Sequence, residues 1–125
     1  MTSFIPDAGL ASIAQTVIDA DSLYLAIGSG DGQTVTDTDL DNDTGETRVQ
    51  ATLTAVTTTT TNDSVQAVAE LTMTAAALVT EVALFDAATG GNMVYYEDGL
   101  NAGEGYQVFA DDVMTFTIKV LGGQY

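Results

Sequence analysis

The sequence contains no cysteine, no histidine and no tryptophan, and it has very few cations. Without histidine and cysteine, the chain lacks the commonest general base, the thiolate nucleophile and the ligands of nearly every zinc site. Only Arg48 and Lys119 oppose 18 acidic residues, so the formal net charge is −16. This balance excludes binding to nucleic-acid phosphates or anionic membranes, because both require a basic surface. We therefore expect a protein that is not an enzyme, has no cofactor, and has no nucleic-acid or membrane partner.

Long apolar runs and basic leader segments are also missing from the sequence. No run approaches the roughly 18 residues that a membrane span needs, and no basic segment precedes an apolar one as in a signal peptide. A hydrophobic fraction of 46% over 125 residues is typical of a folded protein. We expect residues 1–125 to form a single domain.

The kind of acidity is informative, because aspartate and threonine are abundant while lysine is almost absent. Such a chain repels itself in dilute salt, whereas in molar salt the Debye length falls to about 3 Å and the repulsion is screened. This composition favours the surface of a halophilic protein. An acidic secreted protein from a non-halophile is the alternative interpretation.

Hydrophobic spacing predicts one helix within residues 4–19, with Asp7 as its N-cap. Apolar and polar residues then alternate, which is typical of strands. We expect strands at residues 23–27, 48–55, 65–73, 78–85, 93–97, 106–109 and 115–121. Turn signals separate them, among them Asn62–Ser64 and Gly90–Gly91.

This pattern predicts an all-β protein, an antiparallel β-sandwich that is jelly-roll-like and carries one short N-terminal helix. The five threonines Thr57–Thr61 could extend the second strand or form its exposed end. The predicted core consists of Leu25, Ile27, Val49, Leu53, Leu71, Val82, Leu84, Phe116 and Ile118.

An acidic, threonine-rich loop at residues 33–46 offers the strongest candidate for a cation site. Its alternating carboxylates are Asp37, Asp39, Asp41 and Asp43, and calcium prefers six to eight oxygen ligands. The EF-hand register fails, because starting at Asp39 puts Thr44 at the required glycine and Gln50 at the required glutamate. We interpret the segment as a solvated loop that binds divalent cations weakly if at all.

Other polar and aromatic residues do not form a recognisable catalytic pattern. Gly28–Gly32 follows a strand, but no helix or lysine follows it as a phosphate loop would need. Glu81, Glu97 and Asp98 could suggest a glycosidase pair, yet nothing brings two of them together in a cleft. Aromatic residues that could form a sugar-binding platform are more typical of core or sheet packing; they are Tyr95, Tyr96, Tyr106, Phe109 and Tyr125.

The two cations, Arg48 and Lys119, are both expected on the outward faces of strands. Each could neutralise a neighbouring carboxylate across the sheet. Alternatively, one of them could anchor a contact between subunits, for which arginine is suited by its forked donors.

Four segments resemble a family of small structural proteins of tailed phages, found as tail-fibre or head-decoration components. They are Ala8–Ala11, Leu23–Gly30, the spacer Asp37–Leu40 with Glu46–Arg48, and the hairpin Thr80–Val94. The hairpin is the most specific, although Ala83 stands where the family has glycine. The spacer has one residue fewer than the family between its glutamate and its arginine.

The resemblance implies a virion component without an active site. Together with the acidic surface, it implies that the virus is a tailed virus of a haloarchaeon. Because no shaft or coiled-coil heptad accompanies the module, we favour a capsid decoration or turret subunit. The alternative is a tail, baseplate or fibre component, and a third possibility is an extracellular carbohydrate-binding module.

The expected partners are other virion proteins, either the major capsid protein or tail components, together with further copies of this chain. So few cations leave little scope for charge pairing between equally acidic neighbours, so we expect a homo-oligomer held by apolar or strand-edge contacts. Candidate contact segments are Met1–Pro6, Thr57–Thr61 and Leu121–Tyr125.

Overall fold

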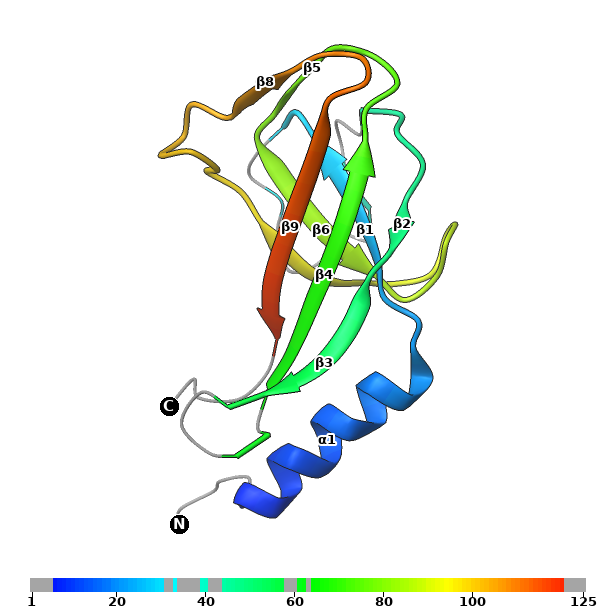
Figure 1. The fold of residues 1–125 in the computed structure, drawn as a ribbon, viewed down its shortest axis with the longest axis vertical. Helices are drawn as coiled ribbons and strands as arrows, with labels where there is room; N and C mark the ends of the chain where they lie inside the picture. Colours follow the sequence, from blue (N-terminus) through cyan, green and yellow to red (C-terminus); the bar gives the residue numbers. More distant parts are fainter. Residues whose placement is uncertain are drawn as a thin grey trace. The chain divides into compact units, whose positions relative to one another are not determined.

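The computed structural model describes residues 6–30, 33, 39–40, 44–57, 61–62 and 64–120. This part of the chain is mostly β-structure with one N-terminal helix, and its strands pair antiparallel (Figure 1). In chain order the elements are α1 (Asp7–Ala20), β1 (Tyr24–Gly28), β2 (Val49–Gln50), β3 (Thr52–Val56), β4 (Ser64–Thr72), β5 (Ala77–Val79), β6 (Glu81–Phe85), β7 (Met93–Glu97), β8 (Tyr106–Val108) and β9 (Val113–Val120). The predicted antiparallel, sandwich-like class is confirmed, whereas a jelly-roll is not established.

The strands form three sheets, with orders β2-β1-β6-β7, β3-β4-β9 and β5-β8. The chain divides into two compact units. The first contains Met1–Asp21, Thr52–Val68 and Phe116–Tyr125, and the second contains Ser22–Ala51 and Ala69–Thr115. Strands β4 and β9 each contribute residues to both units. A single domain over residues 1–125 stays a prediction.

Helix α1 belongs to the first unit and packs against β3 through a narrow apolar stripe. Leu10 and Ala14 are its buried residues, and their spacing of four places them on one face. The N-cap is Pro6, so the prediction of Asp7 is wrong by one position. Asp7 instead lies in the first turn, where a carboxylate interacts favourably with the helix dipole.

The core of the second unit lies around the central strands β1 and β6. All five residues of β6 are buried, and so are the last four of β1. Ala26 pairs with Ala83, and both belong to a buried cluster with Leu40 and Phe85. The alternate residues, which point to the opposite face, are also buried. Both faces of the sheet centre are therefore covered, and this explains why β6 is an apolar run with little alternation.

Two predicted strands are divided in the structure. Residues 48–55 separate at Ala51 into β2 and β3, which belong to different sheets. Residues 78–85 separate at Thr80 into β5 and β6. At this break the Thr80 N–H donates to the Gly28 carbonyl at 3.0 Å, and its hydroxyl donates to the Gly30 carbonyl at 2.7 Å. The described residues therefore form more strands than the seven that we expect from sequence.

The predicted core is largely confirmed, with six residues buried: Leu25, Ile27, Leu71, Val82, Leu84 and Ile118. Val49, Leu53 and Phe116 are half-buried. Strand β3 ends at Val56, so Thr57 does not extend it. Residues 58–60 of the threonine run, and the candidate contact residues 1–5 and 121–125, lie outside the described residues.

Candidate functional site

The acidic loop is represented in the structure by Asp39, because Asp37, Asp41 and Asp43 lie outside the described residues. One Asp39 carboxylate oxygen accepts a hydrogen bond from the Leu40 N–H at 2.8 Å and lies 3.7 Å from an Arg48 guanidinium nitrogen. In the part of the chain that is described, no three acidic residues are arranged to hold a metal ion. Weak or absent binding of divalent cations by the loop stays a prediction.

Leu40 attaches the acidic loop to the second unit. Its side chain is 7% exposed and packs with Ala26, Ala83 and Phe85, next to the half-buried Met93 and Tyr96. Farther along the loop, the Thr44 N–H lies 3.4 Å from the Ile27 carbonyl. The loop, which we expect to be solvated, is therefore attached to the rest of the unit at Leu40 and Thr44, and Leu40 is part of the apolar core.

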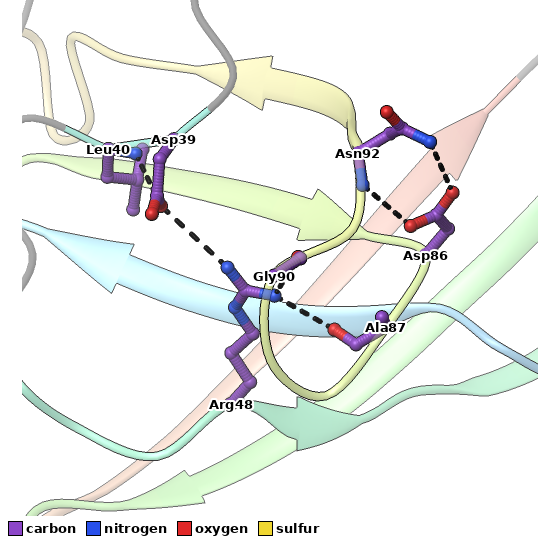
Figure 2. Close-up of polar contacts among 7 residues, drawn as sticks. All are labelled: Asp39, Leu40, Arg48, Asp86, Ala87, Gly90 and Asn92. Atoms are coloured by element: carbon purple, nitrogen blue, oxygen red, sulfur yellow. Dashed lines mark hydrogen bonds and ion pairs between the residues drawn. The ribbon is translucent and has the colours of Figure 1, made fainter.

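Arg48 is the main polar anchor of this site, as Figure 2 shows. Its guanidinium stacks 3.5 Å from the centre of the Phe85 ring, and one nitrogen donates to the carbonyls of Ala87 at 2.9 Å and Gly90 at 2.8 Å. The side chain is only 11% exposed, so the prediction that it points outward is wrong. Because its donors serve the same chain, Arg48 is a structural clamp and is not an open subunit anchor.

The hairpin that Arg48 holds is closed by Asp86 and Asn92 (Figure 2). The Asp86 carboxylate accepts from the Asn92 N–H at 2.7 Å and from the Asn92 side-chain amide at 3.0 Å. These bonds lower the pKa of Asp86, with a smaller contribution from Arg48. Gly90 and Gly91 have φ angles of +63° and +70°, which confirms the predicted glycine turn.

Glu81 lies fully buried at the start of β6. Its carboxylate accepts a hydrogen bond from the Tyr96 hydroxyl at 2.6 Å and one from the Gly30 N–H at 3.3 Å. Burial is the main cause that raises the pKa of Tyr96, and the bond to Glu81 raises it further. Gly28 is required here, because a Cβ at this position would lie 2.8 Å from the Glu81 Cγ. Glu81 therefore fixes the glycine turn and the Tyr96 ring, and is closed to a substrate.

Glu46 makes a further link that the sequence does not reveal. One of its carboxylate oxygens accepts from both the N–H and the hydroxyl of Thr74, each at 2.8 Å. An open groove of about 420 Å³ lies beside it, lined by Gly45–Arg48 and Ala88–Gly90. Its acidic and arginine side chains are already engaged within the protein, so the groove offers no free pair of groups for acid–base chemistry.

The aromatic residues, which are predicted to pack in the core or on the surface of a sheet, differ in their exposure. Tyr95 and Tyr96 are half-buried in β7, whereas Tyr106 is 46% and Phe109 59% exposed. Tyr125 lies outside the described residues. Lys119 is exposed on β9, as predicted. Among the described helices, none is long and apolar enough to cross a membrane.

This site connects loops to the four-stranded sheet, and its polar groups form hydrogen bonds and an ion pair with groups of the same chain. Comparison with known families gives the arrangement a context: residues 10–124 match the family model described as podophage GP4 fiber I protein gp80. The chain belongs to this fibre protein family. It is a non-enzymatic virion component of the tail-fibre type. A comparison with curated proteins finds no match.

Membership of the fibre family confirms the resemblance to tailed-phage structural proteins in its general form. It corrects the preference for a capsid decoration or turret subunit, because the match favours the tail-fibre alternative. A haloarchaeal host has no support from the match, since the family is named for a podophage. The halophilic interpretation of the surface therefore depends on composition alone.

Proposed function

We propose that this chain is a structural module of a phage tail fibre, whose partners are other tail proteins. The observation that carries the proposal is the family match over residues 10–124. The geometry of the second unit supports it, because Arg48, Glu81 and Asp86 all serve to fix loops and turns. A surface made rigid in this way is suited to repeated contact within an assembly, since little conformational entropy remains to be lost on binding.

The proposal excludes a role in sugar cleavage or transfer. Glu81 is enclosed by Tyr96 and the glycine turn, and the aromatic residues do not converge on the groove beside Arg48, whose lining contains no aromatic side chain. Contact with the rest of the fibre, and no chemical step, is the function that this arrangement supports best.

Labelling of intact virus particles tests the proposal. Antibodies raised against the purified chain and coupled to gold should label the tail in electron micrographs, and preincubation with excess purified chain should remove the label. Label spread over the head would contradict the proposal and restore the capsid interpretation. Particles that carry no label, although the antibody recognises the protein released from them, would place it in the interior and would also contradict the proposal.

A further inference from the structure

Glu81, at the start of β6, is the one acidic side chain among the described residues that is fully buried. A buried carboxylate needs hydrogen-bond donors, because burial removes it from water. Glu81 accepts one short bond, of 2.6 Å, from the Tyr96 hydroxyl and one long bond, of 3.3 Å, from the Gly30 N–H. Tyr96 is therefore the stronger of these two partners.

A second carboxylate lies beside the same hydroxyl. Ala83 pairs with Tyr96 across the two strands, and Glu81 lies two residues before Ala83, so Glu81 and Tyr96 are on one face of the sheet. Asp98, which follows β7 and is exposed, has a carboxylate oxygen 3.4 Å from the Tyr96 oxygen. A hydroxyl has one hydrogen to donate, so Tyr96 has a choice between two acceptors, and the shorter distance assigns the bond to Glu81.

Both members of this bond also help to hold the acidic loop. Gly30, whose N–H is bonded to Glu81, lies in the turn that precedes the loop at residues 33–46. Tyr96 packs against the apolar cluster that contains Leu40, the buried residue of the loop. The loop is thus attached next to Glu81 at its start and next to Tyr96 at Leu40.

We propose that Glu81 and Tyr96 form a pH-sensitive switch that controls how firmly the start of the acidic loop is held. At neutral pH the ionised Glu81 accepts from the Tyr96 hydroxyl and from the Gly30 N–H. In acid, a proton from solvent adds to the Glu81 carboxylate, which becomes a weaker acceptor because its bonds lose their charge assistance. The Tyr96 hydroxyl then donates to Asp98, and the Gly30 N–H is released from Glu81.

Among the described residues, the strands that pair with β6 bring two titratable groups to Glu81, which are Tyr96 and Asp98. In β7, Glu97 lies on the opposite face of the sheet, because it is adjacent to Tyr96 in the strand. In β1, Tyr24 lies at the end farthest from Glu81. Neither cation of the chain forms an ion pair with Glu81. This inference does not depend on where the protein sits in the virion.

Amide hydrogen exchange of the full chain, followed by NMR, tests the switch. Between about pH 7.5 and about pH 4 we expect the protection of the Gly30 N–H, corrected for the intrinsic exchange rate, to fall roughly tenfold. Glu81→Gln has no charge to lose, so its Gly30 protection should be low at both pH values. Glu97→Gln is the matched control, because it removes an acid from the other face of the sheet, and it should keep the wild-type pH dependence.

Three results would overturn the proposal: equal Gly30 protection at both pH values in the wild type, a wild-type pH dependence in Glu81→Gln, or its loss in Glu97→Gln. The second result would assign the pH dependence to the carboxylates of the acidic loop itself. Circular dichroism checks that each variant is folded. If Glu81→Gln is not, Tyr96→Phe replaces it: this change removes a donor that favours the ionised Glu81, so the release should move to higher pH, and a release at the wild-type pH would overturn the proposal.

Discussion

The four-stranded and three-stranded sheets differ in how their strands are covered. Every residue of β6 is buried, whereas β3 has no fully buried residue and β9 has one, Ile118. The first sheet is enclosed on both faces at its centre and is tied by Arg48 and Glu81. The strands β3 and β9 keep an exposed side rich in threonine. In β4, the central strand of the three-stranded sheet, five of nine residues are buried. We infer that the edge strands β3 and β9 tolerate change better than the fully buried strand β6.

The largest expected effect is the removal of a central ring. Phe85→Ala should lower the free energy of unfolding by about 3–5 kcal/mol, because Phe85 is fully buried and a large-to-small change leaves a cavity. Phe116→Ala in β9 should cost about half as much, since Phe116 is only half-buried. Denaturant unfolding at constant salt measures both. Equal losses would contradict the comparison between the sheets.

The two cations give a second comparison of the same regions. Arg48→Lys should destabilise the protein by about 1.5–3 kcal/mol, because an ammonium cannot bond to the Ala87 and Gly90 carbonyls and at the same time stack flat on Phe85 and face Asp39 with a second nitrogen. Lys119→Gln is the control on β9 and should change stability by less than about 0.5 kcal/mol. A larger loss for Lys119→Gln than for Arg48→Lys would show that the two sheets are stabilised differently from our account.

Gly28, which lies against the buried Glu81, gives a further test of how tightly this region is packed. Gly28→Ala should cost about 1–3 kcal/mol, because the new Cβ would be forced against Glu81. Gly99→Ala serves as the control: nothing lies near its Cβ position, but its φ is +66°, so it isolates a backbone cost of about 1 kcal/mol. Chemical denaturation measures both variants. A smaller loss at Gly28 than at Gly99 would mean that Glu81 moves away without penalty.

Salt should affect the whole chain through its surface charge. Between about 0.1 M and about 2 M NaCl we expect the melting temperature to rise by at least about 5 °C, because screening removes repulsion among the carboxylates. A thermal melt followed by circular dichroism at several salt concentrations measures this. A midpoint that stays constant would defeat the halophilic interpretation of the sequence.

The smallest expected effect concerns Asp86 at the hairpin. Its pKa is lowered by the bonds from Asn92, so its contribution to stability is present above the ordinary aspartate value, near pH 4, and is lost as pH falls through the lowered pKa. The wild type should therefore lose slightly more stability than Asp86→Asn, which has no group to titrate at this position, when pH is reduced below about 4. Identical pH profiles for the two proteins would contradict this role.

Sequence alternation predicts the exposed strands better than the buried ones. β9 follows the expected pattern, with Thr115, Thr117 and Lys119 exposed. The run 78–85 is continuous in sequence, but the chain changes sheets at Thr80 because the polar atoms of Thr80 bond to the glycine turn after β1. That partner is distant in sequence, so local periodicity cannot reveal the break.

The site was less accessible to sequence reasoning than the fold. Alternation places Arg48 outside, whereas the Phe85 ring and two carbonyls draw it inward. A signal did exist, since a lone arginine beside an acidic loop is expected to pair with it. For Glu81, the signal is a carboxylate that opens an apolar run, where a buried acid requires hydrogen-bond donors. Its donors, Tyr96 and Gly30, could be identified only in three dimensions.

The pairing of β1 with β6 also determines when the protein can fold during synthesis. β1 is made early, but its central hydrogen-bonding partner is β6, which is far along the chain. Until the ribosome has released residue 85, β1 has only the two-residue strand β2 to pair with, and its long-range pairing with β6 is slow to form. We therefore expect the nascent chain to be vulnerable to aggregation until β6 emerges.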